Sequence, residues 1–188
     1  MKYRLVLASG SPRRKELLAG LGYEFEVRLL NGIDESHPEG LSGEEIAKHI
    51  SRGKAEAYKT TIAEDELVIT ADTIVYLEGK VLVKPKDETE ARGMLRALSG
   101  KKHQVITGVT LLTKEKMHTF ASVSDVTFAN LSDEEISYYV DKYKPTDKAG
   151  AYGIQEWIGF IGVERIEGSY FNVMGLPVQR LYTELKKF

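Results

Sequence analysis

Short apolar runs alternate with amphipathic, helix-like stretches along this chain, and this alternation restricts the fold more than any other feature. A strand is expected over residues 3–8, followed by a helix over 14–21. Two longer strands are expected over 104–113 and 120–128, and their adjacency in sequence favours a hairpin. Interleaved strands and helices predict an α/β fold, and the adjacent strands predict that its central sheet is mixed.

The remaining elements follow the same pattern. Further strands are expected over 25–30, 67–71, 74–77, 81–83 and 158–166, and further helices after Ser42 and over 87–98, 132–143 and 178–187. Ser42 and Glu45 form the capping-box pattern of a helix start. Because there is no internal repeat or linker, we expect one α/β domain over residues 1–188, with helices flanking the sheet and two lobes around a cleft.

Composition excludes several classes of protein. The formal net charge of −2 argues against a general nucleic-acid surface, because such binding depends on clustered basic residues. The absence of cysteine excludes disulfides, thiolate metal sites and cysteine nucleophiles. The apolar run near the N-terminus is too short for a signal peptide, and no run approaches the length of a membrane span. We therefore expect a cytoplasmic protein without nucleic-acid or membrane partners.

The junction between the first strand and the first helix has the residues of an anion site. Ser11 is a good N-cap and Pro12 suits the first helical position. Gly10 allows close approach to the backbone, and Arg13 and Arg14 add forked donors suited to phosphate. Phosphate binding at this helix N-terminus is one interpretation. An ordinary helix start with solvated arginines is the other.

Carboxylates and lysines elsewhere add to this picture. Asp72 closes the strand expected over 67–71, where it can bind a metal, activate a water or simply form a turn. Glu35 lies in an acidic loop, while Lys54 and Lys84 are each compatible with plain surface exposure. Taken with the two arginines, these side chains form a set suited to phosphoryl chemistry, which needs cations around phosphates and carboxylates for a divalent ion.

A glycine-rich segment near the C-terminus ends at Gln155, whose amide can both donate and accept, as reading a pyrimidine edge requires. Other chemistries lack support, because no phosphate-loop, dinucleotide-binding, zinc-protease or serine-hydrolase motif is present. The four histidines are scattered without the spacing of metal ligands. Trp157 is expected to be buried, with stacking on a base as the alternative.

The chain resembles the Maf family of nucleoside triphosphate pyrophosphatases. The resemblance rests on blocks that occur in order from about residue 5 to 185: Ser9-x-Ser11-Pro12-Arg13-Arg14, Lys54-Ala55, Ala71-Asp72-Thr73, Lys84-Pro85, Ser99-Gly100, His103-x-Val105-x-Thr107-Gly108, Asp147 to Gln155, Gly168-Ser169-Tyr170 and Gly175-Leu176-Pro177. It implies a Maf-like fold related to the inosine triphosphate pyrophosphatases. It also implies hydrolysis between the α and β phosphates, with a divalent metal, Mg²⁺ or Mn²⁺, as cofactor and a homodimeric assembly.

The resemblance also implies roles for individual residues. Asp72 would accept the proton of the attacking water or serve only as a metal ligand, with Glu35 as the other ligand. The residues implied around the phosphates are Ser9, Arg13, Arg14, Lys54 and Lys84. Within this set Arg14 is the one that plain surface charge would also explain.

Three positions imply a branch of the family. Arg13, Thr73 and Gln155 match the Arg, Thr and Gln of members acting on dTTP and UTP rather than on 7-methyl-GTP. Two alternatives stay open: a nucleotide-binding regulator of septum formation that needs no turnover, and a sugar-nucleotide transferase.

Overall fold

The computed structural model describes residues 2–188; Met1, the first residue of the domain predicted over 1–188, lies outside the described residues. The elements, in chain order, are β1 (Arg4–Leu7), α1 (Pro12–Ala19), β2 (Phe25–Val27), α2 (Gly43–Glu56), β3 (Glu66–Leu77), β4 (Lys80–Leu82), α3 (Glu88–Leu98), β5 (Lys102–Leu112), β6 (Met117–Phe128), α4 (Asp133–Tyr143), η1 (Pro145–Asp147), η2 (Ala149–Ala151), α5 (Trp157–Gly162), β7 (Val163–Glu167), α6 (Tyr170–Met174) and α7 (Val178–Leu185).

The strands form one mixed sheet, which confirms the predicted fold class. Their order is β2-β1-β3-β5-β6-β7, and β4 pairs with β3 outside this path. β1 pairs in parallel with both β2 and β3, so that Leu5 stands opposite Phe25 and Leu67. β4 pairs antiparallel with β3, and β7 antiparallel with β6. Parallel and antiparallel ladders therefore coexist, as the interleaved helices and adjacent strands predicted.

The chain forms two compact units. The first takes in the described residues up to Thr73, together with Thr107–Ser122 and Gly175–Phe188. The second comprises Ile74–Ile106 and Val123–Met174. Strands β3, β5 and β6 each contribute residues to both units. The single domain and its cleft remain predictions.

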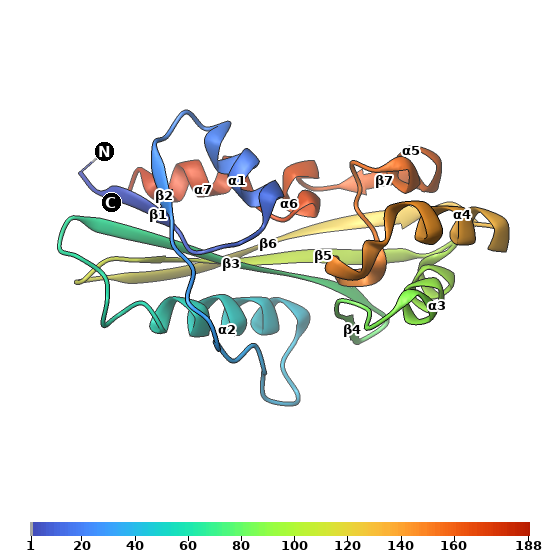
Figure 1. Cartoon of the computed structure of the whole chain (residues 1–188), viewed down its shortest axis with the longest axis horizontal. Coiled ribbons are helices and arrows are strands. Elements are labelled where there is room, and N and C mark those ends of the chain that lie inside the picture. Colours follow the sequence, from blue (N-terminus) through green and yellow to red (C-terminus); the bar gives the residue numbers. More distant parts are fainter. Residues whose placement is uncertain (1) are drawn as a thin grey trace. The chain divides into compact units, whose positions relative to one another are not determined.

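In the first unit, helices cover both faces of the strands. α1 and α7 lie on one side and α2 on the other (Figure 1). α2 begins as predicted, because Ser42 and Glu45 complete a capping box. The backbone of α2 approaches β5 closely: a Cβ atom at Gly108 would lie 2.1 Å from the carbonyl oxygen of Ala47. Ser51 of α2 also meets Thr110 of β5, with 3.1 Å between the hydroxyl oxygens.

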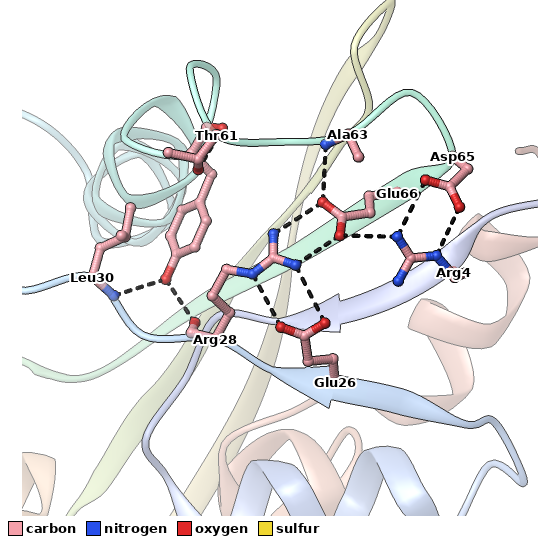
Figure 2. A network of polar contacts seen from close by, with 9 residues as sticks. Arg4, Glu26, Arg28, Leu30, Thr61, Ala63, Asp65 and Glu66 are labelled. Carbon is pink, nitrogen blue, oxygen red and sulfur yellow. Dashed lines mark hydrogen bonds and ion pairs between the residues drawn. The ribbon is translucent and has the colours of Figure 1, made fainter.

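A network of charged side chains ties the N-terminal ends of β1 and β3 to β2 (Figure 2). Glu66, whose side chain is 3% exposed, accepts hydrogen bonds from Arg28 at 2.7 and 2.9 Å. Arg28 also pairs with Glu26, and Arg4 reaches both Asp65 and Glu66. The Arg28 guanidinium holds the pKa of Glu66 down to about 2, well below its ordinary value. Glu66 therefore stays ionised although it is buried.

In the second unit, α3 packs against α4 and both contribute to one apolar core with the strands. His103 of β5 is buried in this core, with Nε2 2.7 Å from the hydroxyl of Tyr152 and its ring edge-on to Phe128. Burial lowers the pKa of His103 to about 4. This histidine is therefore a hydrogen-bonded core residue.

The strand predicted over 158–166 is wrong in its first half. Residues Trp157–Gly162 form helix α5, and β7 begins only at Val163. The turn packs Gly159 against the chain so closely that a Cβ atom there would lie 1.7 Å from the carbonyl oxygen of Ile154. Glycine alone permits this approach, and so the apolar run coils instead of extending. Trp157 is partly buried and packs edge-on against Tyr138.

The prediction that Asp72 closes a strand is also wrong. β3 runs without interruption from Glu66 to Leu77, so Asp72 lies inside it. The residues after Asp72 are Thr73, Ile74 and Val75, which are β-branched and favour continued extension.

Over residues 2–188, none of the helices is long and apolar enough to cross a membrane.

Candidate active site

The junction between β1 and α1 has the predicted local structure. Ser11 is the N-cap of α1 and its hydroxyl accepts a hydrogen bond from the Arg14 amide at 3.4 Å. Pro12 occupies the first helical position. Ser9 is buried, and its hydroxyl accepts from the Ser11 amide at 3.3 Å. The positive dipole end of α1 thus lies directly beyond the end of β1, as an anion site requires.

Arg14 is not a surface charge. Its guanidinium donates to the Gly175 carbonyl at 2.9 Å, to the Thr73 hydroxyl at 3.0 Å and to the Ser9 hydroxyl at 3.4 Å. Burial lowers the pKa of Arg14, while the negative charge of Asp72 acts in the opposite direction. The helix-start alternative of a solvated arginine is therefore excluded for Arg14.

Thr73 is the shared partner in this network. Its hydroxyl oxygen lies 2.9 Å from that of Thr107, in addition to the bond from Arg14. It also donates to the Gly175 carbonyl at 3.4 Å. Gly175 has a φ of +121°, a conformation that side chains other than glycine rarely adopt. A position implied in base selection is thus held by contacts from three separate segments.

The two predicted carboxylates come together around one lysine. Lys54 Nζ lies 2.7 Å from Asp72 Oδ1 and 2.9 Å from Glu35 Oε1. The Lys54 and Asp72 side chains are 14% and 15% exposed, whereas Glu35 is 55% exposed. Lys54 extends from the last turn of α2, and Asp72 from the middle of β3. This cluster combines a carboxylate able to accept a proton with a cation able to meet phosphate.

The loop that carries Glu35 is anchored at both ends. At its start, the buried hydroxyl of Tyr58 donates to the Arg28 carbonyl at 2.8 Å and accepts from the Leu30 amide at 3.2 Å. At its end, the Ser42 capping box begins α2. The loop that carries Glu35 is therefore held at Tyr58 and at the start of α2, although the loop itself is exposed.

The donor set fits a divalent cation only in part. Among residues 2–188, no group of three or more His, Asp and Glu side chains forms a metal cage. Glu35 and Asp72 nevertheless converge on one positive charge, which shows that the two carboxylates can share a cation. Mg²⁺ is commonly held by one or two carboxylates together with phosphate oxygens and water. The pair therefore suits an ion that completes its shell from a substrate.

Two predicted residues belong to the second unit. Lys84 is exposed and follows β4. Gln155 follows η2, and its Oε1 atom is buried without a hydrogen-bond partner in the described chain. An unpaired buried acceptor costs about 1–3 kcal/mol, so it is typical of a group that meets a ligand.

Comparison with known proteins decides the family. A family model described as Maf-like protein matches residues 4–188. This chain belongs to the Maf family. A dTTP/UTP pyrophosphatase of Phocaeicola vulgatus is 64% identical over 99% of the chain and 96% of the relative, and one of Parabacteroides distasonis is 62% identical over 100% and 97%. A dTTP/UTP pyrophosphatase of Flavobacterium psychrophilum is 48% identical over 97% and 93%.

Among solved structures, the Maf chain is similar to a HAM1 protein from Coxiella burnetii, with a TM-score of 0.50 and 16% identity. The similarity covers 99% of this chain and all of the other. It concerns the fold alone.

Within this Maf protein, the predicted residues fall into separate groups. Ser9, Arg14 and Thr73 belong to one hydrogen-bond network, and Glu35, Lys54 and Asp72 to one ion cluster. Arg13 lies in the first turn of α1 and is partly buried. Both groups and Arg13 lie in the first unit, whereas Lys84 and Gln155 lie in the second.

Sequence reasoning missed the buried lysine next to the predicted glutamine. Lys148 is 8% exposed and pairs with Asp147 and Glu156, and Glu156 also accepts a hydrogen bond from Tyr139. The sequence offered a signal, because lysine is rarely buried unless it is paired, and Asp147 and Glu156 lie close to Lys148 in this segment.

Proposed function

We propose that this chain hydrolyses dTTP and UTP to the nucleoside monophosphate and pyrophosphate. The observation that carries the proposal is the ion cluster in which Lys54 joins Asp72 and Glu35. Relatives that cover nearly the whole chain bear the name dTTP/UTP pyrophosphatase, which supports the same reaction. The cluster has the charges that attack at a phosphorus atom needs, and the names specify the substrates.

In the proposed reaction Asp72 takes a proton from a water whose oxygen attacks the α-phosphorus. The new bond joins that oxygen to phosphorus, and the bond to the bridging oxygen breaks, releasing pyrophosphate. Lys54 lies 2.7 Å from Asp72, where its positive charge would also meet the oxygens of a bound phosphate. Mg²⁺ or Mn²⁺, held by Glu35 and Asp72 together with phosphate oxygens, would neutralise charge on the triphosphate.

Phosphate binding is assigned to the start of α1 and to the lysines. The positive dipole end of α1 and the side chains of Ser9 and Arg13 would meet phosphate oxygens. Arg14 commits three N–H groups to protein acceptors, and a guanidinium has five, so a phosphate contact would use the remaining two. Lys84 is proposed as a further phosphate ligand on the family resemblance.

Base selection is assigned to Arg13, Thr73 and Gln155. Uracil and thymine present an N3–H donor beside an O4 acceptor, and a primary amide can match both. The unpaired Oε1 of Gln155 supports this assignment, because an N3–H donor would satisfy it. Cytosine has an unprotonated N3 beside an N4 amino donor, so it would not match the amide in the orientation that suits uracil.

Assembly and location are proposed on the resemblance. We infer a homodimer in the cytoplasm, with a nucleoside triphosphate as the partner and neither nucleic acid nor membrane involved.

Product analysis in ¹⁸O-labelled water tests the proposal. We expect purified protein with Mg²⁺ or Mn²⁺ to convert UTP and dTTP to labelled monophosphate and unlabelled pyrophosphate. Label in the pyrophosphate would instead indicate attack at the β-phosphorus. Nucleotide binding without turnover would favour the regulator, and sugar-dependent UTP consumption without UMP would favour the transferase.

A further inference from the structure

A cluster of charged side chains centred on the buried Lys148 lies beside the turn that contains Gln155. Lys148 is 8% exposed, and its ammonium lies 2.8 Å from Asp147 and 3.2 Å from Glu156. The Glu156 side chain is 19% exposed and follows Gln155 directly in the chain. The Lys148–Glu156 ion pair therefore involves the residue directly after the glutamine that is proposed to read the base.

Tyr139 connects the same segment to helix α4. Its hydroxyl donates to Glu156 Oε2 and accepts from the Gly153 amide at 3.0 Å. The Glu156 amide in turn donates to the Gly153 carbonyl at 3.0 Å, closing a turn over residues 153–156. One hydroxyl thus holds both ends of the turn that contains Gln155, and Tyr139 itself is completely buried.

Gly153 leaves no room for this arrangement to relax. A Cβ atom at position 153 would lie 2.9 Å from Glu156 Cδ and 3.0 Å from Lys148 Cε. The two charged side chains therefore pack directly on the backbone of the turn. Their position and the backbone conformation are coupled, since neither can shift without the other.

Stability alone does not account for such a cluster. Burying an ion pair gains little over apolar packing of the same volume, so charges retained in a core commonly serve another purpose. Here they contact the turn over residues 153–156, in which the Oε1 of Gln155 is buried without a partner in the described chain. An amide that waits for a ligand in a fixed orientation needs a rigid support.

We infer that Tyr139, Glu156 and Lys148 are positioning residues that orient the Gln155 amide and thereby set the preference for uracil and thymine over cytosine. This inference rests on the proposed function. It assigns specificity to residues that do not themselves touch the base.

The test compares Tyr139→Phe with the wild type on UTP and CTP. We expect the ratio of kcat/KM for UTP over CTP to fall about tenfold, mostly through KM for UTP, because the turn loses the hydroxyl that holds both ends. Asp141→Asn is the matched control: it also lies on α4, where its side chain is 60% exposed and pairs with Arg92. We expect it to retain the wild-type ratio.

A second pair of variants covers the case in which Tyr139→Phe fails to fold. Glu156→Gln keeps an acceptor for Tyr139 and should retain more of the ratio than Glu156→Ala. An unchanged ratio in Tyr139→Phe and Glu156→Ala, or an equal loss on both nucleotides, would overturn the inference.

Binding of non-hydrolysable α,β-imido analogues separates the two proposals. The uridine-to-cytidine ratio of dissociation constants should fall in the variants even if the wild type shows no turnover. Absence of turnover in the wild type would count against the proposed function, and an unchanged binding ratio would count against the positioning role.

Discussion

Lys54 Nζ and Asp72 Oδ1 lie 2.7 Å apart, so the last turn of α2 is ion-paired with the middle of β3. Glu35 reaches the same ammonium from its loop at 2.9 Å. The local charge thus depends on three segments at once. Removing either carboxylate leaves Lys54 with one partner, whereas removing Lys54 leaves two carboxylates without that cation, so the members can be tested separately.

Asp72→Asn is expected to lower kcat by about 10²- to 10⁴-fold, because the amide cannot accept the proton of the attacking water. The thermal midpoint should stay near the wild-type value, since Lys54 keeps its contact with Glu35. Initial rates and a circular dichroism melt measure both. Asp65→Asn, an exposed neighbour at the start of β3 paired with Arg4, is the control and should retain activity. Turnover at the wild-type rate in Asp72→Asn would exclude the catalytic assignment.

Gln155→Ala is expected to reduce the preference for UTP over CTP more than it reduces the best rate. The reason is that truncation removes the amide proposed to read the base and leaves every residue of the ion cluster in place. Values of kcat/KM for a nucleotide panel check this. Gln104→Ala, which breaks a bond to Asp125 in the same unit, should leave the preference intact. Equal losses on every nucleotide would contradict a role in reading the base.

Arg14→Lys is expected to destabilise the fold by about 1–3 kcal/mol, because an ammonium cannot reproduce the forked contacts to Gly175, Thr73 and Ser9. Urea titration at pH 7 measures the change in free energy of unfolding. Arg13→Lys, its neighbour in the same helical turn, should cost less. Equal stability of the two variants would show that the Arg14 network does not contribute to the fold.

Glu66→Gln is expected to cost about 2–3 kcal/mol of stability at pH 7, since Arg28 loses its charged partner. The folded-state pKa of Glu66 is lowered to about 2 from 4.5, so its contribution is complete above pH 4.5 and is lost as the pH falls toward 2. Urea titrations at pH 7 and pH 3 should therefore show a smaller difference between wild type and variant at pH 3. A constant difference would argue against this linkage.

His103 predicts a second loss of stability at a different pH. The unfolded histidine takes up a proton below about 6.5, whereas the folded residue stays neutral until about pH 4. The unfolded state thus binds more protons across this window, and the free energy of unfolding falls by up to about 3 kcal/mol as the pH drops. His103→Gln should flatten this part of the profile.

Local features of the sequence predicted local structure well. Ser11, Ser42 and Ser132 cap helices as expected, because a cap depends on residues no more than three positions away. The mid-strand position of Asp72 was missed, since a carboxylate beside β-branched residues reads equally as a turn. The helix at Trp157–Gly162 was missed because its cause is the close packing of Gly159 on Ile154.

For the candidate site, too, features set by nearby residues were predictable from the sequence and contacts between distant segments were not. The residue types needed for phosphoryl chemistry were evident, and the family resemblance named Glu35 and Asp72 together, which the structure brings to the same lysine. The buried role of Arg14 was not, because its partner Gly175 lies 161 positions further along the chain. No rule about helix starts anticipates a contact of that range.

Gly108 carries no chemistry of its own, yet it determines how far Lys54 can reach. Ala47, the residue of α2 that it touches, precedes Lys54 by two helical turns on the same face. Any side chain at position 108 would push α2 outward and draw the ammonium away from Asp72. Substitutions of Gly108 should therefore impair turnover although the residue lies outside the site. Such alleles would be inactive without changing any catalytic side chain.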